Sequence, residues 1–448
     1  MTEVQAARSA DPRLMRRALG ACAIGNATEW FDYSTYGFLA IILGSVFFPS
    51  EDPTISLLSS FAVFGIAFVI RPIGGLVFGP LGDKVGRQRI LAFTIILMAA
   101  ATFAAGLLPG YATIGIWAPI LLVFLRLVQG FSAGGEYGGA ATFMAEYAPD
   151  ERRGFWTSWL EFGSLTGYFM GAGLVTLLTV SLSDAAMSSW GWRVPFLVAG
   201  PLGIVGLYLR LKLQDTPNFK ALEEAGEVEE SPLRNTFTHA WRPMLLLGGI
   251  MVIGHIGNYV LLAYMVNYLQ NTMNVGGTTA LLITFVAIVF MLAVIWRVGT
   301  LSDRFGRKTV LAAACGGFIV FAYPAFWLIS LGNWPTTLLG MLILALCQVL
   351  ILGTIPSTLP ALFPTEVRYT GFAISYNIAA AAFGGTAAYV AGYLVSATGS
   401  NYAPAFYLMG AAAVSLIPVL LSPETARQPL RSGLESPSEP DPVAAGDR

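Results

Sequence analysis

The chain carries one loop motif twice, each time in a short polar gap between two long apolar runs. The first copy reads GPLGDKVGR at residues 79–87, and the second reads GTLSDRFGR at residues 299–307. Two glycines, a leucine, an aspartate, a cation and a final arginine recur at the same spacing. An internal repeat of this kind in an apolar chain indicates a membrane protein built from two related halves.

A second pair of related motifs supports the duplication. The stretch PDERRGF at residues 149–155 has a slightly longer counterpart, PTEVRYTGF, at residues 364–372. Both pairs of motifs occupy matching positions in the two halves. In the first pair, Asp83 and Asp303 are placed to face helix N-termini or arginine side chains. A simpler interpretation, in which all four loops are turns with solvated charges, stays open at this point.

The composition excludes an ordinary soluble protein. The chain has 448 residues, of which 55% are hydrophobic and only 11% are charged, whereas soluble proteins carry about 25% charged residues. Lipid must therefore solvate much of the surface. The net charge of −1 gives no indication of a nucleic-acid partner. The three cysteines lie in apolar runs without metal-ligand spacing, so we expect neither a metal nor a cofactor.

The apolar runs predict an all-α integral membrane protein with twelve transmembrane helices in two six-helix bundles. A spanning helix needs about 20 apolar residues, and twelve stretches satisfy this: 18–44, 56–79, 90–109, 118–147, 155–181, 192–211, 243–270, 278–298, 310–330, 336–362, 370–397 and 404–421. The predicted domains are an N-terminal tail (1–17), a first bundle (18–211), a linker (212–242), a second bundle (243–421) and a disordered tail (422–448).

The distribution of lysine and arginine predicts the orientation. Almost all of them fall in the tails, in alternate connectors or beside these segments, and the other connectors contain none. The positive-inside rule then places both termini in the cytoplasm. The linker is rich in acidic residues, and we expect it to be solvated, with a surface helix over residues 218–230. The chain should accordingly be a multi-pass protein of the cell membrane.

Two carboxylates in the first span are the leading candidates for chemistry. Glu29 lies about 17 Å into the predicted span at 1.5 Å per residue, and Asp32 follows three residues later. Ionisable residues inside a membrane are costly and usually functional. Two close carboxylates repel each other in a low dielectric, and this favours proton uptake, as a proton-coupled carrier requires. The alternative is a structural pair that an arginine on a neighbouring helix neutralises.

The fourth span contains two more candidates. Arg126 is expected to face Glu29 or Asp32, and its planar fork suits a carboxylate of the protein or of a substrate. Glu136 stands among four glycines that permit close helix approach. It could relay a proton or serve as a buried hydrogen-bonding post. Arg71 and Glu161 are placed towards the cytoplasmic side, where we expect gating or packing roles.

The remaining candidates could contact a small molecule. His255, Asn258 and Tyr259 are spaced to share one face of the seventh span. Trp30 and Tyr36 belong to a set of membrane aromatics that could surround a quaternary ammonium group. For each of them a packing role is the alternative interpretation. We therefore predict proton coupling at Glu29, Asp32 and Glu136, and substrate contacts at Arg126, Trp30, Tyr36, His255, Asn258 and Tyr259.

The loop motifs together resemble the signature of the major facilitator superfamily. Within it, the stretch Gly25–Gly37 with Glu-Trp-Phe-Asp at its centre looks like the metabolite:proton symporter family, and six further stretches agree: 71–75, 113–119, 129–132, 190–196, 357–365 and 424–430. The resemblance covers residues 18 to 430 and is strongest to members that carry proline and betaine. It implies a cytoplasmic gate that the loop motifs latch, with Asp83, Arg87, Arg153, Asp303, Arg307 and Arg368 as its residues.

The resemblance also implies a function. We expect a proton-driven importer, working by alternating access and as a monomer, for a small zwitterionic or carboxylate metabolite, most simply a proline or betaine type osmoprotectant. Glu29 and Asp32 match the acidic pair of the family's first span. A proton symporter for organic acids such as 2-oxoglutarate, citrate or shikimate is the alternative within transport. A non-transporting membrane sensor and a membrane enzyme are alternatives of other classes, and no catalytic constellation supports the latter.

Overall fold

The computed structural model describes residues 12–51, 53–211 and 232–430. Within these ranges the chain is almost entirely helical and contains no β-strand. This follows from the lipid environment, where a helix satisfies every backbone hydrogen bond internally. The predicted surface helix at residues 218–230 lies outside the described residues.

Six long helices form the first half of the chain. They are α2 (Pro12–Phe47), α3 (Pro53–Val85), α4 (Arg87–Leu107), α6 (Trp117–Tyr147), α7 (Arg153–Ser181) and α9 (Arg193–Leu211). Short elements connect them: α5 (Tyr111–Ile114), η1 (Asp150–Arg152), α8 (Asp184–Ala186) and the π-helical η2 (Met187–Gly191).

The second half follows the same plan with more interruptions. After α11 (Pro232–His239), its spans use α12 (Trp241–Tyr259), α14 (Gly277–Phe305), α15 (Arg307–Ser330), α16 (Trp334–Leu352), α18 (Arg368–Ala379), α19 (Gly385–Thr398) and α20 (Ala403–Leu421). The short elements are η3 (Val260–Tyr264), α13 (Met265–Asn267), η4 (Tyr268–Thr272), α17 (Ile355–Thr358), η5 (Pro360–Leu362), η6 (Thr365–Val367) and η7 (Ala380–Gly384). Of these, η3, η4 and η7 are π-helical.

All twelve predicted spans fall on helices. In the described part of the chain, eleven helical segments are long and apolar enough to cross a membrane. The twelfth, α2, is 36 residues long but is not among them. Its polar residues, including Asn26, Glu29 and Asp32, lower its mean hydropathy, and all three are buried against protein rather than exposed to lipid.

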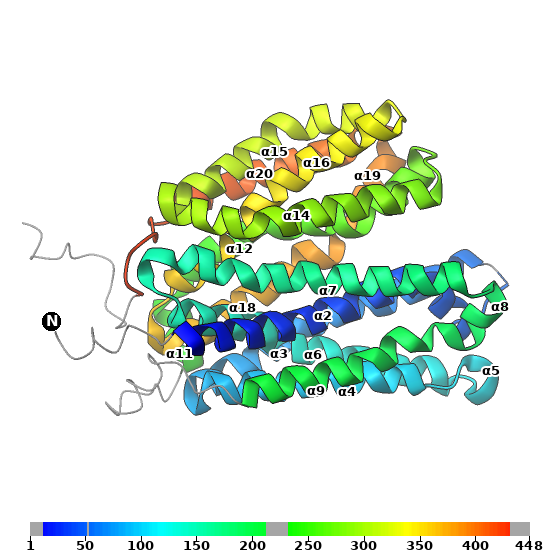
Figure 1. Ribbon diagram of the computed structural model, residues 1–448, viewed down its shortest axis with the longest axis horizontal. Helices are drawn as coiled ribbons and strands as arrows, with labels where there is room; N and C mark the ends of the chain where they lie inside the picture. Colours follow the sequence, from blue (N-terminus) through cyan, green and yellow to red (C-terminus); the bar gives the residue numbers. More distant parts are fainter. Residues whose placement is uncertain (1–11, 52, 212–231, 431–448) are drawn as a thin grey trace, which may run out of the picture.

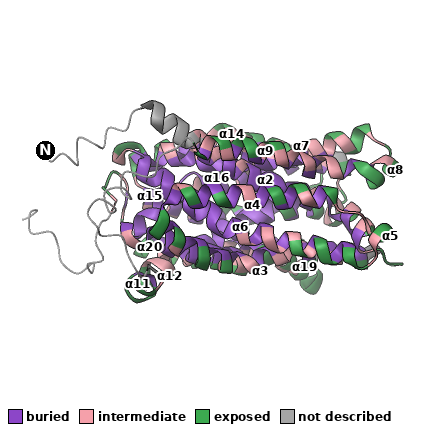
Figure 2. Cartoon of the chain, turned by 90° about the horizontal axis from the view of Figure 1, so that it is seen from below, coloured by how far each residue is buried: buried purple, intermediate pink, exposed green. Residues whose placement is uncertain are grey.

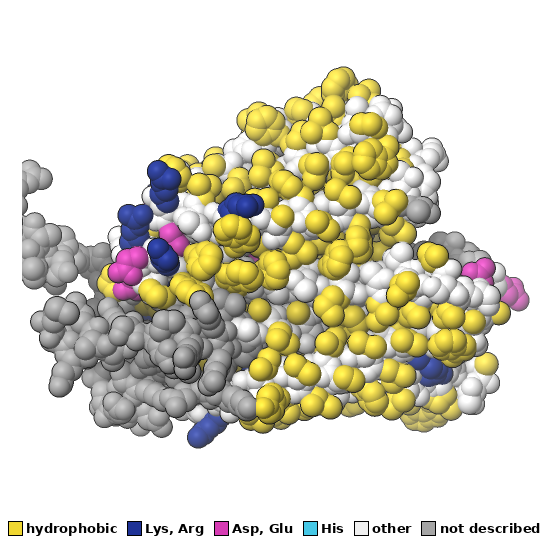
Figure 3. Space-filling view, in the orientation of Figure 1, with side chains coloured by type: hydrophobic (Ala, Val, Ile, Leu, Met, Phe, Trp, Pro, Cys, Tyr) yellow, Lys and Arg dark blue, Asp and Glu magenta, His cyan; other side chains and the backbone are white. Residues whose placement is uncertain are grey.

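The long helices lie side by side in two groups (Figure 1). The helices α2, α3, α4, α6, α7 and α9 form one group, and α14, α15, α16 and α20 belong to the other. Buried residues concentrate along the helix faces that look inward (Figure 2). Hydrophobic side chains are spread along the long face that Figure 3 shows, as expected of a surface in contact with lipid.

The repeated loop motifs are more helical than the sequence suggested. Helix α3 continues to Val85, and α4 begins at Arg87, so the predicted loop is reduced to Gly86 with φ 100°. Gly306, with φ 95°, separates α14 from α15 in the same way. These two glycines supply the turn, because a positive φ is costly for other residues. Gly79 has another role: a Cβ there would lie 2.9 Å from Cα of Thr370 in the other half.

The segment after α20 corrects a second expectation. We predicted a disordered tail from residue 422, but residues 422–430 pack against the end of the molecule where the repeated loops lie. The Glu424 carboxylate accepts hydrogen bonds from the backbone N–H groups of Arg307 (3.0 Å) and Lys308 (3.2 Å). The orphan N–H groups at the start of α15 explain this order, since an acidic side chain satisfies them.

Candidate functional site

The two carboxylates of α2 do not share one environment. Glu29 forms a buried ion pair with Arg71 of α3, whereas Asp32 lies 2.8 Å from Arg126 of α6. Residues three positions apart on a helix point about 60° apart, and this rotation is enough to direct them to different neighbours. The mutual repulsion expected from the sequence is therefore relieved by two separate arginines.

Arg71 holds its position through several contacts. Its Nε donates to the Tyr33 hydroxyl at 3.1 Å, and its guanidinium lies over the rings of Tyr33 and Phe68 at 4.8 and 5.1 Å. The second carboxylate oxygen of Glu29 has no hydrogen-bond partner although it is buried. A gating or packing role for Arg71 was expected and stays a prediction, and the structure adds that Arg71 is the partner of the leading candidate carboxylate.

Arg126 belongs to a buried polar network in which only one of its nitrogens, Nη1, has a hydrogen-bond partner. Its Nη1 donates to Asp32 and to Gln129, each at 2.8 Å. Gln129 in turn donates to Asp32 at 2.9 Å and to Thr102 at 2.8 Å. Tyr36 packs its ring 4.3 Å from the guanidinium carbon of Arg126. Arg126 thus faces Asp32 rather than Glu29, and its predicted contact with substrate stays a prediction.

Glu136 serves as a junction between helices of the first half. Both of its oxygens accept from Arg210 of α9, and one also accepts from Thr94 of α4 at 2.9 Å. Arg210 additionally donates to the Leu91 carbonyl. Glu136 was interpreted either as a proton relay or as a buried residue that holds helices together by hydrogen bonds, and these contacts match the second interpretation. Arg210 itself was missed, because it stands at the end of a span and resembled a flanking charge.

A small cavity lies between the two halves. Its volume is about 20 Å³, which is room for roughly one water molecule. The wall combines residues of α2, α7, α12, η3, α16, α17 and α18: Trp30, Glu161, Ser164, Leu165, Tyr168, Met251, Gly254, His255, Asn258, Leu262, Leu352, Ile355 and Tyr376.

Three of the six predicted substrate contacts line this cavity: Trp30, His255 and Asn258. Tyr259 is not part of the wall but packs against Trp30, with 6.1 Å between the two ring centroids. Arg126 and Tyr36 are not part of the wall. The indole N–H of Trp30 and Nε2 of His255 are buried without a hydrogen-bond partner. Buried polar groups in this condition are rare in native structures and are available to a ligand.

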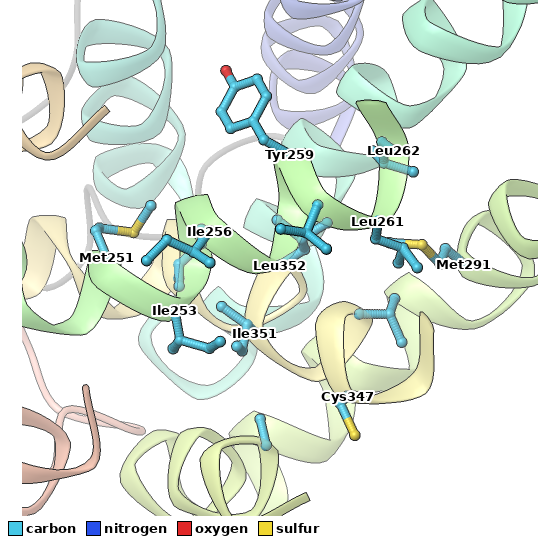
Figure 4. Close-up of a cluster of buried hydrophobic side chains, with 14 of the residues drawn as sticks. Met251, Ile253, Ile256, Tyr259, Leu261, Leu262, Met291, Cys347, Ile351 and Leu352 are labelled. Atoms are coloured by element: carbon cyan, nitrogen blue, oxygen red, sulfur yellow. The ribbon is translucent and has the colours of Figure 1, made fainter. Parts of the chain in front are cut away.

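The apolar side of the cavity is formed by the second half. Met251, Leu262 and Leu352 line it and continue into the cluster that Figure 4 shows, together with Ile253, Ile256 and Ile351. This packed cluster fixes α12 against α16. The polar residues of the wall come mainly from α2, α7, α12 and α18.

The first repeated loop reaches across to the second half. Oδ2 of Asp83 accepts from the backbone N–H and the hydroxyl of Thr370, at 2.9 and 2.7 Å. Arg87 is ion-paired with Asp83 and with Glu146. Arg368 also contacts Glu146, at 2.6 Å. We call this cluster the first latch, and it comprises Asp83, Arg87, Glu146, Arg368 and Thr370.

The second repeated loop makes the reciprocal contact. Asp303 accepts from the backbone N–H groups of Gly154 and Phe155, at 2.8 and 2.9 Å, at the start of α7. Arg307 lies 3.8 Å from Asp303 and donates to the carbonyls of Ser357 and Thr425. The second latch comprises Asp303, Arg307, Arg153, Glu424 and the carbonyls they contact.

The expectation that Asp83 and Asp303 face helix N-termini thus agrees with these contacts. All six predicted gate residues, including Arg153 and Arg368, take part in the two latches. Arg153 pairs with Asp150 and donates to the Gln428 carbonyl at 3.0 Å. Gating of a pathway by these contacts stays a functional prediction.

Sequence reasoning missed several of the charged residues now seen at the site. For Arg71 and Glu161, which were recognised as intramembrane charges, it missed only their neighbours: Glu29 for Arg71 and the central cavity for Glu161. Their presence in an apolar run was already the signal of a functional position. Glu146 and Glu424 stood next to loops and offered no such signal, because nothing in a sequence distinguishes a latching carboxylate from a solvated one.

Two helix groups enclosing a central cavity, with latches at one end, define a membrane transporter of the major facilitator type. A family model for the Major Facilitator Superfamily matches residues 22–388. The chain belongs to this superfamily of secondary transporters, and it is a multi-pass membrane protein rather than an enzyme.

Curated relatives narrow the family further. The glycine betaine/proline/ectoine/pipecolic acid transporter OusA of Dickeya dadantii is 43% identical over 96% of this chain and 87% of its own length. The proline/betaine transporter of Escherichia coli K12 shows the same identity and coverage. The ectoine/proline transporter of Corynebacterium glutamicum is 38% identical over 94% of this chain and 86% of its own length.

Solved structures agree on the fold. The proton:xylose symporter XylE bound to 6-bromo-6-deoxy-D-glucose superposes with a TM-score of 0.78 at 16% identity. The match covers 94% of this chain and 98% of that one.

Proposed function

We propose that this chain is a proton-coupled symporter that imports a small zwitterionic osmoprotectant of the proline or betaine type. The observation that carries the proposal is the place of the Glu29–Arg71 pair beside the cavity between the halves. Trp30, which follows Glu29, lines that cavity. The names of three relatives at 38–43% identity support the substrate class.

The coupling step follows from the ion pair. When Glu29 takes up a proton, it loses the charge that neutralises Arg71. A buried arginine without a counter-charge is strongly unfavourable, so the carboxylate of the substrate becomes its new partner. Proton and substrate then bind together, and each favours the other. Asp32 and Arg126 form a second buried ion pair on another face of α2, and they are our second candidate for proton coupling.

The transport cycle would be alternating access, in which the two halves rock about the cavity. The latches close the end where the repeated loops lie. We propose that this end faces the cytoplasm of a bacterial cell, because most lysines and arginines of the connectors lie there. The two predicted bundles act as the moving units, and one chain suffices, since a single chain encloses the cavity.

The test is uptake into proteoliposomes that contain the purified chain. Wild type should accumulate labelled glycine betaine or proline against its concentration gradient when the outside of the vesicles is made more acidic than the inside. Glu29→Gln should abolish this accumulation and still exchange labelled for unlabelled substrate across the membrane. The exchange assay and the size-exclusion profile show that the variant is folded. Full accumulation by Glu29→Gln would contradict the proposed coupling, and Asp32→Asn would then be tested in the same assay.

The organic-acid alternative is tested in the same vesicles. Excess unlabelled 2-oxoglutarate, citrate or shikimate should leave betaine uptake unchanged. Uptake of one of these acids without uptake of betaine or proline would replace the substrate class. The absence of any uptake would favour the sensor alternative.

A further inference from the structure

Glu161 differs from the other carboxylates buried in the described part of the chain. Six of the seven lie within 4 Å of an arginine: Glu29, Asp32, Asp83, Glu136, Glu146 and Asp303. Glu161, only 4% exposed, forms no such pair among these residues. Its hydrogen-bond partners are neutral hydroxyls, that of Tyr137 at 2.5 Å and that of Ser164 on the same helix. An isolated buried carboxylate is costly unless something else supplies the missing charge.

The position of Glu161 indicates where that charge comes from. Glu161 lies in the wall of the central cavity, opposite residues of the second half. Among the described residues of the wall it is the only one with a carboxylate, and none is a lysine or arginine. A cation that enters the cavity would therefore meet one carboxylate in the wall, while Arg71 beside the cavity is already paired with Glu29.

The rest of the wall suits an organic cation. Trp30, Tyr168 and Tyr376 present aromatic rings to the cavity. Tyr376 is stacked on Tyr137, the donor to Glu161, at 4.3 Å between ring centroids. His255 lies edge-on to the Tyr376 ring at 4.9 Å. Aromatic faces attract alkylated ammonium groups through their quadrupoles, and a carboxylate adds the full charge.

We propose that Glu161 binds the ammonium group of the transported zwitterion and thereby sets the specificity of the site. This proposal rests on the proposed function and deepens it. The substrate ammonium lies between Glu161 and the aromatic rings, while its carboxylate points towards Arg71. The present cavity of about 20 Å³ is smaller than such a molecule, so the zwitterion enters when the halves move apart.

The same arrangement explains discrimination between substrate classes. A dicarboxylate such as 2-oxoglutarate has no ammonium group to neutralise Glu161 and would add a second negative charge nearby. Like charges at short range repel strongly where water is excluded. Glu161 should therefore favour betaine and proline and exclude organic acids, which separates the two transport hypotheses by one side chain.

The experiment measures equilibrium binding of glycine betaine, proline and 2-oxoglutarate to the full chain in detergent at one fixed neutral pH, and the quaternary ammonium of betaine is charged at every pH. Glu161→Gln keeps the size of the side chain and an acceptor for Tyr137 but removes the charge. Its Kd for glycine betaine should rise about 10- to 100-fold. Glu161→Asp keeps the charge on a shorter side chain and should lie between Glu161→Gln and wild type.

Two controls keep the result interpretable. Tyr137→Phe removes the hydrogen bond but not the charge, so its Kd should rise less than that of Glu161→Gln. Glu151→Gln changes an exposed carboxylate of η1 and should match wild type. Size-exclusion profiles identify any variant that fails to fold, and Glu161→Asp then carries the test.

The outcomes separate this inference from the proposed function. If wild type binds betaine and Glu161→Gln binds it with the same Kd, the proposed function is unaffected and the proposed role of Glu161 is wrong. Unchanged binding combined with lost pH-driven accumulation would overturn it as well and would make Glu161 a proton carrier. If wild type binds 2-oxoglutarate but neither betaine nor proline, the proposed function itself is wrong.

Discussion

The two latches come from one repeated motif but use different partners. In the first, Glu146 lies between Arg87 and Arg368, so the latch is a buried cluster of carboxylates and arginines. Glu146 stands three residues before Pro149, the first residue of the motif PDERRGF. The matching position in the second half, three residues before Pro364, is occupied by Ala361. In the second latch, the Arg307 guanidinium donates to the carbonyl of Thr425 in the C-terminal segment, and Glu424 accepts from the Arg307 backbone N–H.

The two latches share the contact of the aspartate and differ in the acceptor of the arginine. In both latches an aspartate accepts hydrogen bonds from backbone N–H groups near the start of a helix in the opposite half. That interaction depends only on the aspartate and the helix dipole, and it recurs. The arginine needs a further acceptor, but any nearby carboxylate or carbonyl can supply it, and here the halves diverge.

The largest effect should come from Glu146→Gln. This change leaves Arg87 and Arg368 buried with one shared negative partner removed, and breaking a buried pair costs about 3–5 kcal/mol. The melting temperature of the purified protein should fall clearly. Glu151→Gln, an exposed carboxylate five residues later, is the control and should melt like wild type. Equal melting temperatures for the two variants would show that the first latch contributes nothing.

An intermediate effect is expected from Asp83→Asn and Asp303→Asn. Each loses a charged cap worth about 1–2 kcal/mol. Asp83→Asn should lower the free energy of unfolding more than Asp303→Asn. Asp83 lies closer to its arginine, at 3.3 Å from Arg87, whereas Asp303 lies 3.8 Å from Arg307. Hydrogen exchange gives a local measurement of both.

Asp83→Asn should speed exchange at the Thr370 amide, and Asp303→Asn should speed it at Gly154 and Phe155. Arg304→Ala, an exposed cation beside Asp303, is the control and should leave all three amides protected. Faster exchange at the same amides in both variants would mean that the latches open as one unit.

The smallest effect should follow from Glu424→Gln. Glu424 caps the partly exposed start of α15 and lies only in the second latch, so the expected cost is about 0.5–1 kcal/mol. Exchange should rise at the amides of Arg307 and Lys308 and stay unchanged at Thr370. A loss as large as that of Glu146→Gln would show that the C-terminal segment, and not the charge cluster, dominates closure.

Much of the fold could be read from the sequence because lipid imposes strict rules. Each apolar run of sufficient length had to be a helix, so all twelve predicted spans fall on helices. The prediction failed where helices extend beyond the apolar run, as α3 does to Val85, because a protein partner can satisfy a polar turn that lipid cannot. The candidate site was predicted in part: Trp30 and His255 line the cavity, whereas Tyr36 and Arg126 pack elsewhere.

By itself, the sequence determined that this chain is a duplicated helical membrane protein, since composition, run length and the twin loops follow from local chemistry. It also indicated that Glu29 and Asp32 are exceptional, since charges in an apolar helix are costly wherever they face. Only the tertiary structure decided the partners. The pairing of Arg71 with Glu29 and of Arg126 with Asp32, and the lack of an ion pair for Glu161 among the described residues, depend on how helices far apart in the chain are rotated against one another. A small rotation redirects a side chain from one neighbour to another, and no local pattern records it.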